Sequence, residues 1–236
     1  MASRQIDLPE FGKVLLTKRK GARSLRLSVD HNGQLRVSLP QWAPYQAGID
    51  FAKAKSDWVL ERQRLLKPNF YDGQAIGKAH HLRLSADLSA SKVTSRLKTT
   101  EAYVSFPAGL NPKSPEVQQA AQTVSQKALR SEAEQLLPQR LQQLASQHGF
   151  NYGSVRIRHL KSRWGSCSSK GDITLNLFLM QLSWRQIDYV LLHELVHTKV
   201  LRHVPPFWEE FGRHLPEARQ LSREVSRSQP KFSSTS

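Results

Sequence analysis

The chain has 236 residues, of which 39% are hydrophobic and 23% are charged, and this composition is ordinary for a soluble globular protein with its own core. Its single cysteine, Cys167, excludes an internal disulfide, and no apolar run approaches the roughly 18 residues that a membrane-spanning helix requires. Residues 1–16 lack the apolar stretch of a signal peptide. We therefore expect a cytoplasmic protein that does not enter a membrane.

Positive charge dominates the chain, with 35 Lys and Arg residues against 19 Asp and Glu residues and a formal net charge of +16. Residues 1–113 carry 19 basic and 9 acidic residues and the remainder carries 16 and 10, so the excess of +10 and +6 is spread over both parts. A field of this sign attracts polyanions, which makes nucleic acid or another polyanion a candidate partner. The alternative is a basic surface that only meets solvent.

Residues 1–111 are predicted to form a β-rich region. Alternating apolar and polar residues are typical of half-buried strands, and Asn32-Gly33 indicates a hairpin turn. A helix is predicted over residues 47–66, and the adjacent His80 and His81 alternate faces of a strand, so we interpret both as surface residues. The predicted strands cover residues 14–18, 23–29, 34–39, 71–77, 80–86, 92–99 and 102–107.

A second domain is predicted over residues 112–226, because the preceding residues 111–115 read N-P-K-S-P, the composition of a boundary. A helix is predicted to begin at the end of this segment and to stop near Gln147, and Pro138 inside it predicts a kink or a split into two helices. The serine-rich residues 227–236 are predicted to be a disordered tail.

Two strands are predicted within the second domain, over residues 154–161 and 172–180, and a further helix over residues 207–223. Arg163 and Trp164 lie between the strands. We expect one of the two strands, with these two side chains, to pair with an extended peptide. The alternative is an ordinary hairpin that only shields the helix after it.

An H-E-x-x-H motif, formed by His193, Glu194 and His197, lies on the best-defined helix of the sequence. Ser183 and Gln186 form a capping box at its start, and its buried face is marked by Ile187, Val190, Leu191 and Leu195. Two histidines one turn apart project side by side and can bond one metal ion, with the glutamate beside it to hold a water molecule. This pattern is typical of zinc hydrolases, although the motif also arises by chance in proteins that are not enzymes.

A third metal ligand is predicted at His203, six residues after the second histidine of the motif. In a continuous helix this residue would lie about 9 Å further along the axis and on a different face, so the helix must stop near residue 199 or 200 and the chain must turn back. Pro205 and Pro206 do exclude a helix that runs unbroken through Val204. The rival ligands are Glu209, Glu210 and His214.

The same segment resembles a known family. Residues 163–167 read R-W-G-S-C, residues 173–176 read I-T-L-N, residues 188–197 read D-Y-V-L-L-H-E-L-V-H, and F-W follows at 207–208. These motifs are similar to the signature of the YgjP-like metal-dependent hydrolases, and a looser likeness extends over nearly the whole chain from about residue 24.

The resemblance implies an α+β fold with a zincin-like metallopeptidase core, in which the H-E-x-x-H helix packs on other helices and a small sheet beside the N-terminal β-rich region. It implies Zn²⁺ held by His193, His197 and His203, with Glu194 as the catalytic base. It also implies kinship with SprT-like proteases, some of which act on proteins attached to DNA. Arg202 stands where the family has Asn, and Val204-Pro205 replaces Ser and its neighbour, which puts the substrate preference in doubt.

The function predicted from these observations is that of a zinc-dependent metallopeptidase that cleaves a protein or peptide substrate. One alternative is a metal-dependent phosphohydrolase acting on nucleotides, since the same chemistry could attack phosphorus. Another is a basic protein associated with nucleic acid, in which the metal is structural. The side chains predicted to bind substrate or to stabilise the developing negative charge are Arg163, Trp164, His159 and Tyr189.

Overall fold

The computed structural model describes residues 3–30, 33–66 and 69–232. These residues divide into two compact units, one that ends at Asn69 and also takes in Phe232, and one that runs from Phe70 to Lys231. The predicted boundary at 111/112 does not coincide with this division and lies inside the second unit. The reason is that the three strands preceding it pack against the long helix that follows it.

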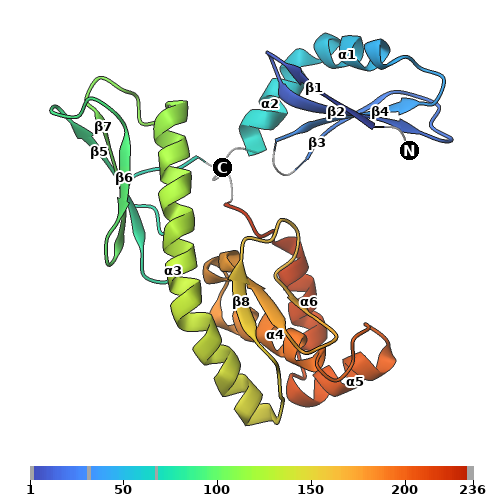
Figure 1. The fold of residues 1–236 in the computed structure, drawn as a ribbon, viewed down its shortest axis with the longest axis vertical. Helices are drawn as coiled ribbons and strands as arrows, with labels where there is room; N and C mark the ends of the chain where they lie inside the picture. The colour runs from blue at the N-terminus through green and yellow to red at the C-terminus, as the bar shows by residue number, and fades with distance from the viewer. Residues whose placement is uncertain (1–2, 31–32, 67–68, 233–236) are drawn as a thin grey trace. The chain divides into compact units, whose positions relative to one another are not determined.

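The first unit is built on a four-stranded sheet with strand order β1-β2-β4-β3 (Figure 1). Its strands are β1 (Ser3–Leu8), β2 (Gly12–Arg19), β3 (Arg26–Val29) and β4 (Leu35–Pro40). The first strand was not predicted, and it pairs antiparallel with the second. The predicted hairpin between residues 23–29 and 34–39 is confirmed as an antiparallel pair. Of its turn, Asn32 lies outside the described residues, and Gly33 has a φ of 78°, which favours glycine.

Two helices complete the first unit, α1 (Tyr45–Ala54) and α2 (Ser56–Leu66). The sequence predicted one helix over residues 47–66, but the chain breaks it at Lys55. The described core of this unit is apolar throughout and consists of Phe11, Val14, Leu16, Leu35, Val37, Leu39, Ala43, Ala52 and Val59.

The second unit is arranged along one long helix, α3 (Pro115–His148), which runs continuously for 34 residues (Figure 1). The predicted split at Pro138 is not seen, because Leu137 and Leu141 are fully buried on either side and hold the helix in its packing. The helix begins after Ser114, as predicted, and ends at Gly149 with a φ of 68°.

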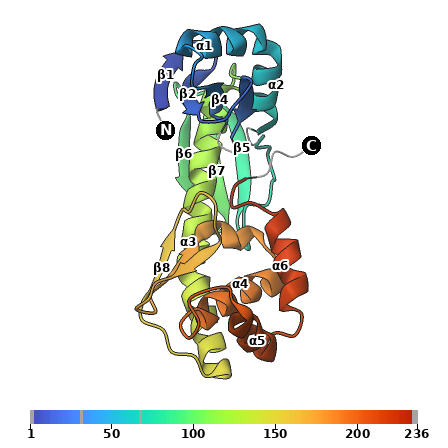
Figure 2. The same cartoon turned by 90° about the vertical axis from the view of Figure 1, so that its right-hand side faces the viewer.

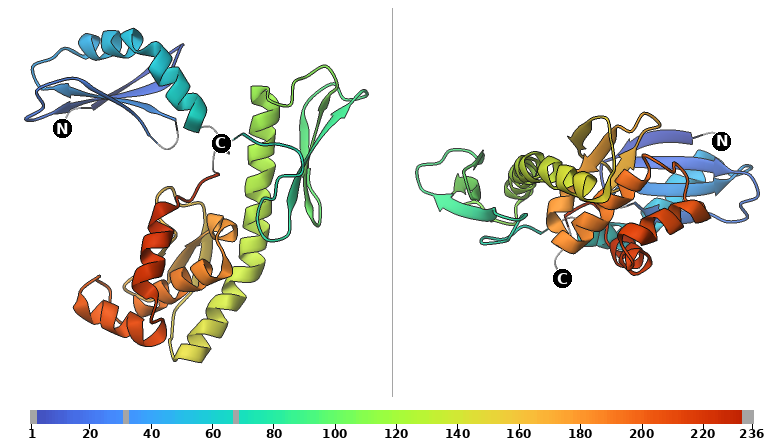
Figure 3. Two further views of the ribbon diagram at one scale, coloured as in Figure 1. Left: turned by 180° about the vertical axis from the view of Figure 1, so that it is seen from behind. Right: turned by 90° about the horizontal axis from the view of Figure 1, so that it is seen from below.

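A three-stranded sheet covers the first half of α3 (Figure 3). It consists of β5 (His81–Asp87), β6 (Thr94–Leu97) and β7 (Glu101–Pro107), in the order β5-β7-β6. The predicted strand over residues 71–77 is not formed, and only an isolated bridge joins Ala75 to His81.

A second three-stranded sheet lies beside the other half of α3, in the order β8-β10-β9. Its strands are β8 (Val155–Arg158), β9 (Gly165–Cys167) and β10 (Ile173–Asn176). The strand predicted over residues 172–180 is shorter than expected, because the Asn176 side chain accepts a hydrogen bond from the N–H of Phe178 and starts the 3-10 helix η1 (Leu177–Gln181). The edge strand β9 was not predicted.

Three helices follow, α4 (Trp184–Val196), α5 (Pro205–His214) and α6 (Ala218–Arg227), and α4 packs against α3 and both later helices (Figure 2). The helix predicted over residues 207–223 is therefore two helices. Disorder was predicted from residue 227, but Arg227 ends α6 and Phe232 is buried; residues 233–236 lie outside the described residues. None of the helices formed by the described residues has the length and apolar character needed to span a bilayer.

Candidate metal centre

The helix α4 begins where the sequence predicted, because its capping box is formed in both directions. The Ser183 hydroxyl accepts a hydrogen bond from the N–H of Gln186 at 3.3 Å, and the Gln186 side chain accepts one from the N–H of Ser183 at 3.1 Å. Ile187, Leu191 and Leu195 are fully buried on the face of α4 opposite to His193 and His197. This packing fixes how the helix is rotated, and hence where His193, Glu194 and His197 point.

The chain turns back directly after α4. His197 is the C-terminal capping residue of the helix, and the N–H of Val200 donates to the carbonyl of Val196 at 2.9 Å. The carbonyl of Val200 in turn lies 3.0 Å from Nδ1 of His197. Pro205 then starts α5 in a new direction, so the short loop between the helices returns His203 towards α4.

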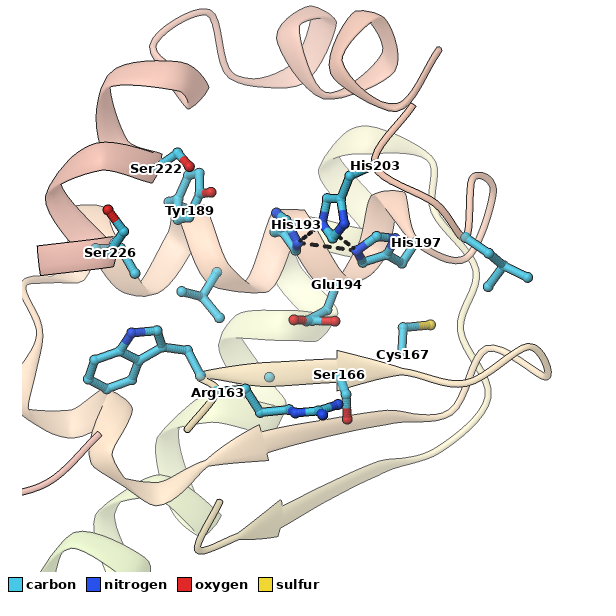
Figure 4. A pocket seen from close by; sticks show the side chains of 15 residues that line it. Arg163, Ser166, Cys167, Tyr189, His193, Glu194, His197, His203, Ser222 and Ser226 are labelled. Carbon is cyan, nitrogen blue, oxygen red and sulfur yellow. Dashed lines mark hydrogen bonds between the residues drawn. The ribbon is translucent and has the colours of Figure 1, made fainter. Parts of the chain in front are cut away.

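The three imidazole rings meet at their Nε2 atoms (Figure 4). The Nε2–Nε2 distance is 3.1 Å between His193 and His197, 3.2 Å between His197 and His203, and 2.9 Å between His193 and His203. Among the described residues, these three form a group whose ligand atoms lie within 4.8 Å of one another. His193 and His197 lie one turn apart at the end of α4, and His203 lies in the loop between α4 and α5.

The rival third ligands do not join this group. Glu210 forms ion pairs of 2.8 Å with both Lys199 and Arg213, and the hydrogen bond from Lys199 is the main reason that its pKa falls to about 2. His214 lies against His148, with 3.2 Å between their Nδ1 atoms. Glu209 is exposed to solvent. The loop therefore brings His203, and none of the alternatives, to the two helix histidines.

The geometry of the three nitrogens fits a metal ion. A tetrahedral zinc bonds imidazole nitrogens at about 2.0–2.1 Å, which places two such nitrogens about 3.3 Å apart. The observed distances of 2.9–3.2 Å are close to this spacing. Because a backbone carbonyl only accepts, Nδ1 of His197 must donate to Val200, and this leaves the lone pair of Nε2 directed at the other rings.

The pKa values of the side chains at this site also favour metal binding, because a metal ion binds a neutral imidazole ring. Burial, with the neighbouring His197 and His203, lowers the pKa of His193 to about 3, so this ring is neutral and able to act as a ligand. Burial and the nearby Glu194 raise the pKa of the Cys167 thiol to about 11. A thiol held in its protonated form is a poor nucleophile, so the chemistry of this site does not depend on it.

Glu194 is buried directly beneath the histidines, with only 4% of its surface exposed. Burial raises the pKa of its carboxyl to about 8, and the charge of Arg163 opposes that shift. Its Oε2 atom has no hydrogen-bond partner among the described residues. A buried carboxylate oxygen with no protein partner is costly unless it faces a cation, a water molecule or a substrate.

A cavity of about 490 Å³ opens onto the three histidines and Glu194. One wall is the edge strand β9, preceded by Arg163 and Trp164, and the other is formed by α4 and α6. The site thus combines a metal-binding histidine group, a buried carboxylate and an open cavity, which are the parts that a metal-dependent hydrolase needs.

Residues 23–228 match the model of the family described as the YgjP-like metallopeptidase domain. The chain belongs to this family. The match spans parts of both compact units, and it makes the protein a metal-dependent peptidase.

Two solved structures are similar to parts of this YgjP-like metallopeptidase. One is the metallopeptidase zymogen abylysin of Pyrococcus abyssi, which is 28% identical, with 42% of this chain and 99% of that chain covered and a TM-score of 0.37. The other is the metallopeptidase zymogen jannalysin of Methanocaldococcus jannaschii, which is 19% identical, with coverages of 37% and 90% and a TM-score of 0.33. A comparison with curated proteins gives no match.

Three of the four predicted substrate residues of this YgjP-like protein line the cavity, namely Arg163, Trp164 and Tyr189. The fourth, His159, lies at the end of β8 with its ring packed on Phe178, the ring centroids being 5.3 Å apart. It is not part of the cavity lining, so it is not positioned to contact a substrate at the histidines. Its strand runs along the far edge of the sheet, which spacing in the sequence could not show.

Sequence reasoning missed the role of Gly165, the first residue of β9. A Cβ atom at this position would lie 2.6 Å from Oε1 of Glu194 and 2.9 Å from its carboxyl carbon. Real Cβ atoms do not approach other atoms this closely, so a residue with a side chain would push the carboxylate away. The only signal in the sequence is the glycine of the R-W-G-S-C motif.

Sequence reasoning also missed Asn176, which is fully buried at the end of β10. Its side-chain amide donates to the carbonyls of Leu160 and Arg163, each at 2.8 Å, and its backbone N–H donates to the carbonyl of Trp164 at 2.9 Å. These bonds fix the loop that leads into β9, and therefore one wall of the cavity.

Proposed function

We propose that this protein is a zinc-dependent peptidase in which Nε2 atoms of His193, His197 and His203 hold the metal and Glu194 is the catalytic base. The convergence of the three nitrogens, all within 3.2 Å of one another, beside a buried carboxylate is the observation that supports this assignment. Each role agrees with what the family resemblance implies.

A catalytic zinc is favoured over a structural one by the number of ligands. Structural zinc sites are closed by four protein ligands, whereas catalytic sites have three and keep a position open. The metal-binding group of the described residues contains three histidines, and the cavity opens onto it.

Zinc, when bound, supplies a Lewis acid that lowers the pKa of a water molecule from about 15.7 towards about 7 and polarises a carbonyl group. The Oε2 atom of Glu194 has no hydrogen-bond partner among the described residues, so the ionised carboxylate, which a bound cation favours, can accept a proton from the attacking water. The same carboxyl group then delivers that proton to the amine that leaves as the peptide bond breaks. Burial of Glu194 between α4 and β9 keeps it close to the reacting atoms.

Two side chains are candidates to stabilise the negative charge that develops on the carbonyl oxygen. Arg163 is an exposed residue that lines the cavity, and Tyr189 lines it from α4, with its ring centroid 5.9 Å from that of His193 (Figure 4). Donors directed at the site where charge develops are worth more than donors that bind the substrate alone.

The substrate backbone is proposed to pair with β9. The sequence predicted that a strand over residues 154–161 or 172–180 would do so, but β10 is the central strand and already has neighbours on both sides. The strand β9 is an edge strand, and its residues Gly165, Ser166 and Cys167 line the cavity. An extended peptide added to such an edge is recognised through its main chain, largely independently of its sequence.

The decisive experiment is Glu194→Gln in the zinc-loaded protein. Turnover of an unfolded protein substrate should fall by about 10²–10⁴-fold, because the amide cannot accept a proton. Zinc content, measured by elemental analysis, should remain at one ion per chain. The matched control is Glu209→Gln, an exposed glutamate on α5, which should leave both quantities unchanged. Full turnover by Glu194→Gln would remove the glutamate from its assigned role.

The same preparations distinguish the alternative reactions. A phosphohydrolase would release phosphate from nucleoside triphosphates in a parallel assay without cleaving the protein substrate, and that result would overturn the proposal. The family match supports peptide substrates and gives no support to nucleic acid as a partner, so the net charge of +16 is not assigned a role in catalysis.

A further inference from the structure

One end of the cavity lies a helix turn away from the reacting groups, towards the start of α4. Tyr189 and Val190 line it, and they precede His193 and Glu194 by four residues each. Residues four apart on a helix are neighbours on one face, about 6 Å apart along the axis. A peptide advances about 3.3 Å per residue, so this end of the cavity is within one or two residues of the bond to be cleaved.

The wall of this end is provided by α6. Ser222, Val225 and Ser226 follow helical spacing and line the cavity, while Leu221 and Ala218 are buried and anchor the helix. Figure 4 shows Ser222 and Ser226 beside Tyr189, on the other side of the histidines from Cys167. The helix α6 packs directly on α4, so the wall and the metal-binding residues belong to one compact unit.

The lining at this end carries no formal charge. Val190 and Val225 are each only 4% exposed, and the polar groups are hydroxyls, with that of Tyr189 hydrogen-bonded to Ser222. The arginines of α6 do not contribute to the lining; one of them, Arg219, lies over the ring of Trp208.

The charged residues that do line the cavity are Glu194 and Arg163. Glu194 lies under the histidines, and Arg163 is directed towards Ser166 on β9 (Figure 4). A charged substrate side chain placed between Val190 and Val225 would therefore lose its hydration without gaining a partner, and that loss is costly.

We propose that the end of the cavity formed by Tyr189, Val190, Ser222, Val225 and Ser226 is a side-chain subsite that selects an uncharged apolar or aromatic residue of the substrate close to the cleaved bond. The inference rests on the proposed peptidase function. It deepens that function by naming a preference, because pairing with β9 alone would not distinguish one side chain from another.

The test uses peptides that differ at one position, next to the bond cleaved, and carry Leu, Phe, Lys or Asp there. With the zinc-loaded full chain, kcat/KM for the Leu and Phe peptides should exceed that for the Lys and Asp peptides by at least about 10-fold. Val225→Asp should raise kcat/KM for the Lys peptide and lower it for the Leu peptide, because it places a carboxylate in the wall. Arg223→Ala, an exposed position on the same helix, is the control and should leave the ranking unchanged.

A second variant is needed because Val225 is buried and its replacement by Asp could prevent folding. Ser226 lines the cavity but is exposed, so Ser226→Asp should fold and should produce the same shift towards the Lys peptide. Equal kcat/KM values for all four peptides in the wild type, or a ranking that neither variant changes, would overturn the subsite.

A binding measurement separates this inference from the proposed reaction. Hydroxamates of Leu, Lys and Asp bind a protein-held zinc ion through the hydroxamate group, and calorimetry gives their Kd without any turnover. We expect the Leu compound to bind the wild type at least about 10-fold more tightly than the others, and Ser226→Asp to reduce that difference. If the Leu preference in binding is present while no peptide is cleaved, the subsite stands and the proposed reaction fails; if peptides are cleaved without any preference, the reverse holds.

Discussion

Two glutamates are buried to the same extent in the second unit, and they have opposite surroundings. Glu132 on α3 and Glu194 on α4 are each 4% exposed. Each also lies against a glycine, because a Cβ atom at Gly77 would overlap a carboxylate oxygen of Glu132 and one at Gly165 would be 2.6 Å from a carboxylate oxygen of Glu194. Both carboxylates are therefore buried at a place where only a glycine leaves room for them.

The difference lies in the hydrogen bonds. Glu132 accepts from the backbone N–H groups of Lys78, Ala79 and His80 at 2.6–3.0 Å, and its Oε1 lies 2.7 Å from Nδ1 of His80. Burial alone would raise the pKa of Glu132, but these bonds outweigh it and lower the pKa. Glu194 has an oxygen without a partner among the described residues, and its pKa is raised to about 8.

Burial of a carboxylate therefore does not by itself indicate catalysis. Where all donors are in place, the group joins two segments; Glu132 holds the loop before β5 against α3. Where a donor is missing, the group is available for a reaction. It also corrects the interpretation of His80 as a surface residue, since His80 is only 7% exposed and interacts with Glu132, while His81 is exposed.

The largest effect on stability is expected for Glu132→Ala. It leaves three backbone N–H groups and a buried histidine without a partner, so the free energy of unfolding should fall by about 3–5 kcal/mol. Urea denaturation measures this loss, and kcat per folded molecule should not change. Glu134→Ala, two residues away on an exposed face with an ion pair to Arg130, should cost less than about 1 kcal/mol. Equal losses in the two variants would contradict the structural role of Glu132.

A smaller loss is expected for Asn176→Ala. The change removes the donor to the carbonyls of Leu160 and Arg163 in a partly buried site, and the free energy of unfolding should fall by about 2 kcal/mol. Because the loop before β9 is released, KM for a peptide substrate should also rise, in contrast to Glu132→Ala. The exposed Asn151→Ala is the control for both measurements. An unchanged KM would show that this loop does not position the substrate.

Gly165→Ala is expected to affect catalysis rather than folding, because it changes the space beside Glu194. The added methyl group must displace the flexible end of Glu194, so the protein should fold and retain zinc while kcat falls by about 10–100-fold, equivalent to about 1.4–2.7 kcal/mol. Steady-state kinetics and elemental analysis measure the two quantities. Ser169→Ala, an exposed position just after β9 that does not line the cavity, is the matched control. Wild-type kcat in Gly165→Ala would mean that the approach of Glu194 to β9 is not needed for turnover.

The smallest effect is a dependence of stability on pH that comes from Glu132. Its pKa is lower in the folded protein than the ordinary value of 4.5, so its contribution is fully present above about pH 4.5 and is lost as the pH falls through the folded value. The difference in the free energy of unfolding between the wild type and Glu132→Gln should therefore shrink below that pH. Denaturation curves at a series of pH values from 7 down to 3 test the sign, and a difference that grows on acidification would reverse it.

Local patterns in the sequence were reliable guides to individual helices and strands. The start of α4 was predicted correctly from the capping box of Ser183 and Gln186. The adjacent placement of the imidazole rings of His193 and His197 was predicted correctly from their spacing. Both predictions depend on residues within about one turn of each other. The start of α3 after Ser114 was also predicted correctly from neighbouring residues, namely Ser114 and Pro115. Patterns failed where a single polar contact stopped an element, as when Asn176 ended the strand predicted up to residue 180.

The capping box and apolar spacing predicted the helix that carries the H-E-x-x-H motif, and helical geometry required the chain to turn back after it if His203 was to be the third ligand. The position of His203 beside the two helix histidines, the contact of Gly165 with Glu194 and the cavity wall formed by α6 all depend on how the helices and strands pack together. The contact between β9 and α4 joins residues that are far apart along the chain. Gly165 and Glu194 are 29 residues apart, and such a contact is fixed by the packing of strand on helix, which no local pattern encodes.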